Sequence, residues 1–67
     1  MTRPATPARL PRLLTVRAVA EATTMPPSSI YDAIYAGELT AHRFGRAVRV
    51  EESEVATWIT RHREAAP

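Results

Sequence analysis

Residues 26–37, PPSSIYDAIYAG, are the stretch around which the rest of the chain is arranged. Proline is well accepted at the start of a helix, because its missing N–H would have no partner there. Gly37 supplies the left-handed residue at which many helices end. Between these limits Ile30, Ala33 and Ile34 recur at helical spacing on one side. The stretch therefore predicts a short helix that buries one apolar stripe.

The opposite side of this helix is small, hydroxylated and aromatic, and it carries a single charge. It consists of Ser28, Tyr31, Asp32 and Tyr35. The outer face of an ordinary surface helix is richer in charged side chains. We therefore expect this face to meet a partner.

A shorter helix is predicted just before it. Thr15 is a suitable N-cap, and Val16, Val19 and Ala20 then repeat at i, i+3 and i+4. We expect a helix over residues 16–22. The residues that follow it precede a proline, which favours extended backbone. The order is helix, short turn, helix, which predicts a helix-turn-helix unit.

Thr24 lies in that turn, at a position where such units often carry a glycine in the left-handed conformation. A β-branched residue is rarely found there. We therefore expect a turn that is either wider than usual or strained.

After Gly37 the apolar residues alternate, which predicts a β-hairpin with Gly45 and Arg46 at its turn. We expect an inner face of Leu39, His42, Phe44, Val48 and Val50. We expect an outer face of Ala41, Arg43, Ala47 and Arg49. A two-stranded hairpin directly after a helix-turn-helix unit is a wing.

A last helix is predicted after the hairpin. Glu51, Glu52 and Glu54 suit its first turn, where acidic side chains complement the helix dipole. Its apolar stripe is Val55, Trp58 and Ile59. As the largest side chain of the chain, Trp58 is expected to close the core against Phe44, Ile34 and Val16.

The 67 residues carry a net charge of only +2, but the charge is unevenly placed. Residues 1–12 and residues 40–50 each carry three arginines and no acid. Two basic segments on a mildly acidic body are typical of proteins that contact phosphates at defined places. We expect a proline-rich flexible arm over 1–12, one domain over 13–64 and a tail over 65–67. The arm is either an unstructured terminus or a basic segment along nucleic acid.

Several classes of protein are disfavoured by the composition. The chain has no cysteine, so disulfides, zinc–thiolate sites and cysteine nucleophiles are excluded. His42 and His62 have no third ligand at a suitable spacing, and we expect no metal site. We see no nucleophile elbow and no glycine-rich phosphate loop. The expectation is a soluble intracellular protein, not an enzyme, with no catalytic residues and no cofactor.

The order of these elements, with Gly37-Glu38-Leu39 and the segment RFGRAVRV at residues 43–50, resembles the excisionase-like helix-turn-helix family. That family is related to the DNA-binding domain of the MerR regulators. The resemblance implies an α+β, mainly helical winged helix-turn-helix that binds DNA, with the second helix in the major groove and the hairpin at the minor groove or its phosphates. The chain departs from the family at Thr24 and at its paired prolines, residues 26 and 27.

The candidate DNA-binding residues lie in the two predicted helices and the hairpin. They are Arg17, Pro27, Ser28, Ser29, Tyr31, Asp32, Tyr35, Arg43, Arg46 and Arg49. Other roles stay open for some of them. The serines could satisfy free N–H groups of the first helical turn, the tyrosines could pack over Leu39 or the arm, and the hairpin arginines could form a solvated edge.

Members of this family include small phage and plasmid excisionases, or recombination directionality factors, which bend attachment-site DNA and direct an integrase toward excision. The resemblance therefore implies double-stranded DNA, an integrase and other copies of the chain side by side on DNA as partners, in the cytoplasm of a bacterial host. One alternative is a small MerR-like transcriptional regulator. A second is a protein-interaction module with an acidic partner.

Overall fold

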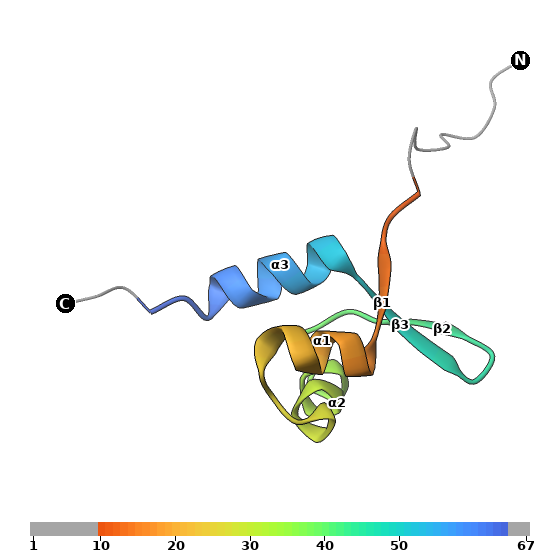
Figure 1. Cartoon of the computed structure of the whole chain (residues 1–67), viewed down its shortest axis with the longest axis horizontal. Coiled ribbons are helices and arrows are strands. Elements are labelled where there is room, and N and C mark those ends of the chain that lie inside the picture. The colour runs from red at the N-terminus through yellow and green to blue at the C-terminus, as the bar shows by residue number, and fades with distance from the viewer. Residues whose placement is uncertain (1–9, 65–67) are drawn as a thin grey trace, which may run out of the picture.

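Six elements follow one another in the computed structural model, which describes residues 10–64 (Figure 1). In chain order they are β1 (Leu13–Thr15), α1 (Val16–Thr23), α2 (Pro27–Tyr35), β2 (His42–Phe44), β3 (Ala47–Glu51) and α3 (Glu52–Arg61). Both predicted helices of the helix-turn-helix unit, the hairpin and the last helix are present. Most of the predicted arm, residues 1–9, and the tail, residues 65–67, lie outside the described residues.

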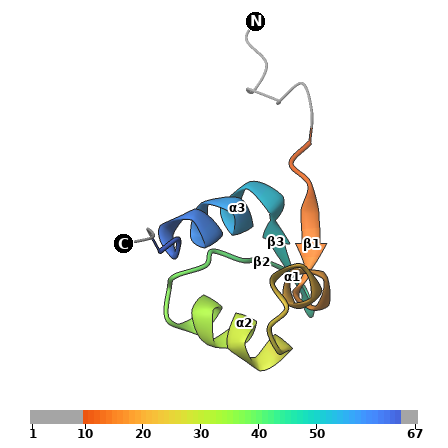
Figure 2. The ribbon, with the colours of Figure 1, turned by 60° about the vertical axis from the view of Figure 1, so that its left-hand side comes forward.

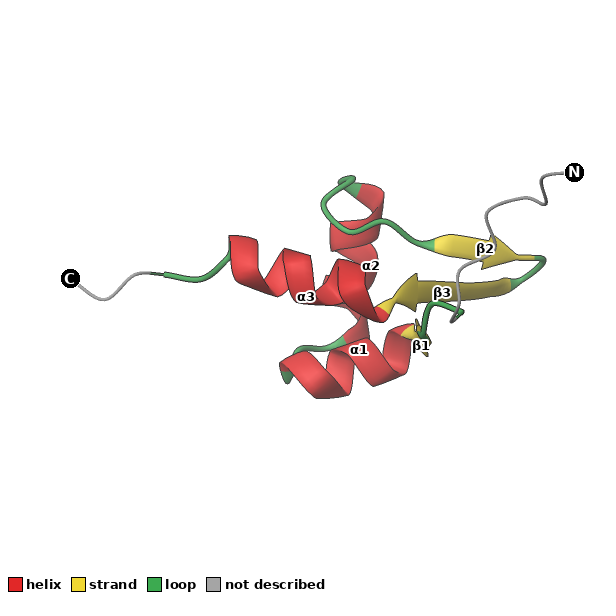
Figure 3. Ribbon diagram, turned by 90° about the horizontal axis from the view of Figure 1, so that it is seen from above, coloured by secondary structure: helices red, strands yellow, loops and turns green. Residues whose placement is uncertain are grey.

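The sheet has three antiparallel strands in the order β1-β3-β2, not the two of the predicted hairpin (Figure 3). The additional strand, β1, pairs Leu14 with Val50 and so extends the hairpin on its β3 side. Strand β1 is not predicted from the sequence, because it has only three residues and no alternating pattern of its own. Its pairing also anchors the start of α1 to the sheet.

The predicted phase of β2 is wrong. Phe44 pairs with Ala47 and His42 pairs with Arg49 across a two-residue turn. Opposite residues of antiparallel strands share a face, so Phe44 and His42 lie on the outer face with Arg49. Val48 lies on the core side, as predicted, and Ala41 also packs against the core. Placing Phe44 beside Val48 would have required one more residue in the turn.

The core lies between the three helices and the inner face of the sheet (Figure 2). Its buried members are Val16, Val19, Ala20, Ile30, Ala33, Leu39, Val50, Val55 and Trp58. Trp58 is 6% exposed, as its predicted role in the core requires, but Phe44 is 56% exposed and does not belong to the core. The predicted stripe of α3 is also only partly correct, because Ile59 is 49% exposed.

Helices α1 and α2 end in the same hydrogen-bond pattern, the Schellman motif. At the end of α1, Met25 N–H donates to Ala20 O (2.9 Å) and Thr24 N–H donates to Glu21 O (3.3 Å). The left-handed residue of that motif is Thr24, with φ 58° and ψ 38°. The prediction of a strained turn is confirmed, since threonine adopts the conformation that glycine usually supplies.

Gly37 ends α2 in the same way, with φ 79°. Glu38 N–H donates to Ala33 O (2.9 Å), and Gly37 N–H donates to Ile34 O (3.1 Å). The predicted end of the second helix is confirmed. Leu39, two residues further on, then enters the core at 1% exposure.

Candidate nucleic-acid interface

The pair α1 and α2 is held as a unit by a cap, a turn and an apolar contact. The Thr15 hydroxyl accepts the Ala18 N–H at 2.9 Å and so begins α1 as predicted. Ala20 is buried on α1, and Ile30 and Ala33 are buried on α2. The small side chains of Ala20 and Ala33 allow the two helices to approach closely. This packing fixes which side of α2 faces outward.

The outward side of α2 is the one predicted from its sequence. Pro27, Ser28, Tyr31, Asp32 and Tyr35 are exposed. Ser29 is half-buried. Pro26 occupies the N-cap position and provides no side-chain acceptor. Within residues 10–64 neither serine hydroxyl forms a hydrogen bond, so both are available to a partner at the start of the helix.

Tyr31 and Tyr35 stack on each other along α2. Their ring centroids are 6.2 Å apart and the ring planes differ by 27°. Tyr35 is 75% exposed, so the stacked pair lies on the surface of α2, on the same side as Asp32. The outer side of α2 therefore presents two phenolic hydroxyls and one carboxylate.

One face of α1 and the turn after it border the start of α2. Arg17 and Pro27 line one shallow hollow together with Thr24 and Met25. Glu21 also lines this hollow, but Arg17 forms no ion pair in the part of the chain that the structure describes. Arg17 and the exposed Pro27 at the start of α2 therefore border the same hollow.

The three hairpin arginines do not share one face, and only Arg46 lies in the turn itself. Arg46 is exposed in the turn, where Gly45 has φ 64°. Arg43 pairs with Val48 and so lies on the core side of the sheet, beyond the core, where it is exposed. Arg49 lies on the outer face, and its Nη1 donates to Val48 O at 2.9 Å. The prediction that Arg43 and Arg49 share the outer face is wrong, for the same reason of register as at Phe44.

The charges of these arginines are not paired with carboxylates in the part of the chain that the structure describes. Between residues 10 and 64 none of Arg43, Arg46 and Arg49 forms an ion pair with a carboxylate. The ion pairs of that part of the chain lie elsewhere, at Arg12–Glu52, His42–Glu51 and His62–Glu38. Figure 1 shows the hairpin projecting from the helical body. Its positive tip therefore stands clear of the acidic residues of α3.

A family model described as a helix-turn-helix domain matches residues 13–63. The chain belongs to this helix-turn-helix family. Excisionase-like DNA-binding proteins are among the members of the family. A search of curated proteins and a search of solved structures each found no match. None of the described helices has the length and apolar content of a membrane span.

Membership of the helix-turn-helix family indicates DNA binding. The resemblance to winged helix-turn-helix proteins is confirmed at the level of the fold, with three helices and a three-stranded antiparallel sheet. Within residues 10–64 no group of three or more His, Asp or Glu side chains is placed to hold a metal ion.

The outer face of the sheet carries His42 and Phe44, which were predicted to lie on the inner face. His42 Nε2 lies 2.7 Å from Glu51 Oε2, and the His42 ring stacks on Phe44 with centroids 6.2 Å apart. The exposed Phe44 therefore has an aromatic neighbour next to the arginine turn. The signal that could have found this arrangement is the two-residue spacing of Phe44 and Ala47 about Gly45-Arg46, which fixes the register of the hairpin.

Proposed function

We propose that the protein is a recombination directionality factor that binds attachment-site DNA, bends it and directs a phage or plasmid integrase toward excision. The observation that carries this proposal is the pairing of two surfaces on one winged helix-turn-helix. One is an exposed α2 face with hydroxyl and aromatic groups and a single charge. The other is a hairpin with three arginines, none of which forms an ion pair with a carboxylate within the described residues.

In this proposal α2 lies in the major groove, which admits a helix and displays a different donor and acceptor pattern for each base pair. The serine and tyrosine hydroxyls of α2 bind base edges or phosphates. The Asp32 carboxylate accepts from cytosine N4, the donor to which carboxylates pair. A carboxylate is repelled by phosphate, so Asp32 acts through selectivity and not through affinity.

The affinity comes from the arginines. Arg46 at the hairpin tip binds phosphates or the neighbouring minor groove, with Arg43 and Arg49 on either face of the same hairpin. Arg17 binds the backbone beside the start of α2. Insertion of arginine into a narrow minor groove favours bent DNA, which is consistent with an architectural role at an attachment site.

We further propose that copies of the domain over 13–64 bind side by side on repeated sites in the cytoplasm of a bacterial host. A closed dimer reads a palindrome, whereas head-to-tail contacts suit direct repeats. Binding to a natural fragment with several sites should therefore be cooperative. Identical binding curves for the fragment and for an isolated site would contradict this part of the proposal.

The test begins with footprinting on the DNA that flanks the gene of the protein itself. Excision by the neighbouring integrase is then measured with and without the protein. The expected result is a footprint over repeated sites and excision that depends on the protein. A footprint at a promoter, with excision unchanged, would favour the small MerR-like regulator instead.

DNA binding itself is tested by its dependence on salt. Each neutralised phosphate contributes about 0.9 to the slope of log K against log salt concentration. A slope near zero would contradict DNA binding and would favour the third reading, a module that binds an acidic protein.

A further inference from the structure

One large aromatic side chain of the hairpin has no role in the core or in the DNA contacts described above. Phe44 is the last residue of β2, directly before the turn, and it is 56% exposed. It lies on the outer face of the sheet, whereas the core lies against the inner face. Figure 3 shows that β2 and β3 extend past the helices to this turn. The ring is therefore accessible at the end of the hairpin.

The neighbours of Phe44 in the hairpin leave its ring standing clear of the sheet. The residue opposite is Ala47, whose side chain is a single methyl group. The next residue in the chain is Gly45, which has no side chain. A phenyl ring between an alanine and a glycine projects beyond both. Single exposed apolar side chains are common on proteins, so the surroundings of this ring decide whether it has a role.

The Phe44 ring is supported on one side. The His42 ring stacks on it, with centroids 6.2 Å apart and ring planes that differ by 28°. His42 is held in turn, because its Nε2 lies 2.7 Å from Glu51 Oε2. An exposed side chain that is already ordered loses less conformational entropy when it binds. The ring is therefore prepared for a contact outside the chain.

The hairpin that carries Phe44 is positively charged. Arg43 precedes it, Arg46 follows in the turn, and Arg49 lies on the same outer face. None of these arginines forms an ion pair with a carboxylate in the described part of the chain. Glu51, the acidic residue of β3, is engaged in the histidine contact. An apolar ring among unpaired arginines suits a polyanion with an apolar interior, and the phosphates and stacked bases of double-stranded DNA have this arrangement.

The width of the hairpin decides which part of it can enter the minor groove. That groove of B-DNA is only about 6 Å wide, whereas the major groove admits a helix or a two-stranded ribbon. Paired strands lie about 5 Å apart before their side chains are counted. The hairpin as a whole therefore cannot lie in the minor groove, and single side chains at its end are what can reach the bases. Phenylalanine is one of the apolar side chains that insert between base steps from this groove and kink the duplex by about 20–90°.

We propose that Phe44 is a wedge that enters the minor groove, separates one base step and kinks the DNA, while the hairpin arginines bind the phosphates along the groove. This inference rests on the proposed DNA binding and deepens it. It assigns the bend to unstacking by an apolar ring and not to arginine insertion alone. Pyrimidine–purine steps such as TA and CA/TG are the most easily unstacked, so the wedge selects a step of this kind.

The bend is measured by Förster energy transfer between dyes at the two ends of a duplex of about 30 base pairs. The duplex carries the sequence that the full chain selects from a randomised DNA library, and the protein is saturating. Kinking shortens the distance between the ends and raises the transfer efficiency. Phe44→Ala should lose most of the increase that the wild type produces, and Phe44→Leu should keep most of it because leucine is also a wedge side chain. The slope of log K against log salt concentration should stay the same in both variants, since no phosphate contact is removed.

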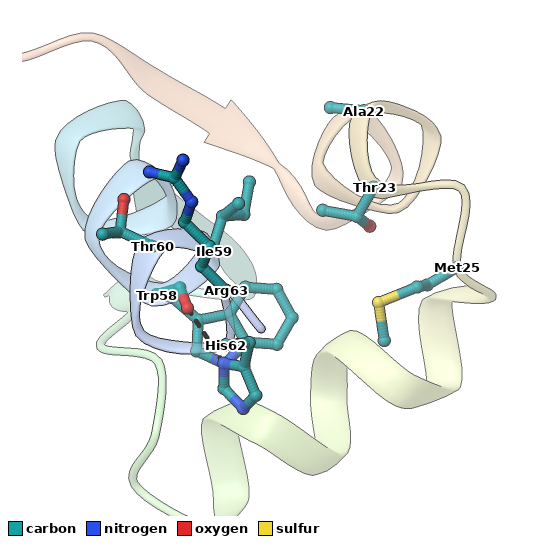
Figure 4. A pocket seen from close by; sticks show the side chains of 8 residues that line it. All are labelled: Ala22, Thr23, Met25, Trp58, Ile59, Thr60, His62 and Arg63. Atoms are coloured by element: carbon teal, nitrogen blue, oxygen red, sulfur yellow. Dashed lines mark hydrogen bonds between the residues drawn. The ribbon is translucent and has the colours of Figure 1, made fainter. Parts of the chain in front are cut away.

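Ile59→Ala is the matched control for loss of an exposed apolar side chain. Ile59 is 49% exposed on α3 and lines a hollow between α1 and α3, together with Met25 and Trp58 (Figure 4). This variant should bend the DNA as the wild type does. Phe44 lies outside the core, so Phe44→Ala should keep the circular dichroism spectrum of the wild type.

Unstacking is detected separately with 2-aminopurine, an adenine analogue whose fluorescence rises when it leaves the base stack. It replaces each adenine of the selected sequence in turn. Because TA and CA/TG steps both contain an adenine, the wild type should raise the fluorescence at one step of the site. Phe44→Ala should not raise it there.

The outcomes separate the wedge from DNA binding. Equal bending by the wild type and Phe44→Ala, with salt-dependent binding by both, would overturn the wedge and leave DNA binding intact. The wedge would also be overturned by a loss of bending in Ile59→Ala, or by the absence of any 2-aminopurine signal with the wild type. If the full chain selected no DNA and bound none in a salt-dependent way, DNA binding and the wedge would both be overturned.

Discussion

Thr24 and Gly37 occupy the same position of the same helix-ending motif, one after α1 and the other after α2. Both have positive φ, 58° for Thr24 and 79° for Gly37. Both motifs close with a hydrogen bond of 2.9 Å from the following residue to a carbonyl five positions earlier. The chain therefore contains its own comparison between a β-branched residue and a glycine in the left-handed conformation.

Thr24→Gly should stabilise the protein. The left-handed conformation costs an L-residue about 1–2 kcal/mol, and glycine removes this cost. Glycine also gives the unfolded chain more conformational freedom, which offsets about 0.5–1 kcal/mol of the stabilisation. We expect a net increase of up to about 1 kcal/mol in the free energy of unfolding, measured by urea denaturation.

Gly37→Ala is the matched control. A Cβ at Gly37 would meet no atom within 4 Å, so the substitution isolates the backbone cost from any steric clash. The same two contributions apply with opposite sign, so the substitution should destabilise the protein by up to about 1 kcal/mol. If both substitutions left the urea midpoint unchanged, the left-handed conformation would carry no cost for a side chain with a Cβ at either position.

The helix ends could be predicted from single residues because capping is local. The hydroxyl of Thr15 caps the start of α1, and the positive φ of Gly37 ends α2. The phase of β2 depended on the number of residues in a turn, and the apolar character of Phe44 favoured the wrong face. Strand β1 depends on pairing with β3, in which Leu14 lies opposite Val50. No local sequence pattern indicates a partner so far along the chain.

In the candidate site too, features set by local spacing could be predicted and features set by strand register could not. The outward face of α2 could be predicted, because one helical period places all of its residues. The directions of Arg43 and Arg49 could not, because a one-residue change of register turns a side chain to the other face of a sheet. Exposure of Ile59 was missed because the spacing of an apolar residue does not reveal whether an opposing element covers it.

Trp58→Ala should unfold the domain under conditions in which Phe44→Ala does not. Truncation of a large buried aromatic side chain costs about 3–5 kcal/mol, which is comparable to the whole stability of a domain of this size. Phe44 is 56% exposed, and its loss removes only a surface stack on His42. Circular dichroism against temperature distinguishes the two variants, and an equally large loss with Phe44→Ala would mean that the hairpin register described above is wrong.

Arg46→Ala should weaken binding to specific and unrelated DNA alike, because a phosphate contact carries no sequence information. The slope of log K against log salt concentration should fall in magnitude by about 0.9. Arg61→Ala removes the same charge from α3, where Arg61 Nη2 donates to Glu38 O at 2.7 Å, and should leave the slope close to that of the wild type. Unchanged affinity of Arg46→Ala at low salt would exclude the hairpin tip from the interface.

Asp32→Asn should change which sequences are preferred and not how strongly DNA is held overall. The amide keeps the size of the side chain, loses its charge and adds a donor, so a cytosine that pairs with the carboxylate should no longer be favoured. Each lost base contact is expected to change discrimination by about 1–3 kcal/mol. Selection from a randomised DNA library, compared between the wild type and the variant, measures this change.

Glu38→Gln separates this effect from the simple loss of a negative charge. Glu38 is exposed and follows the end of α2, so its neutralisation should raise the affinity for all DNA without reordering the preferred sequences. If Asp32→Asn alone changed the order of the preferred sequences, base recognition would be assigned to the outer face of α2. The stacked side chains of Tyr31 and Tyr35 lie on that same face. If the two variants selected the same sequences as the wild type, α2 would contribute shape and not base contacts, and sequence preference would have to come from deformation of the DNA.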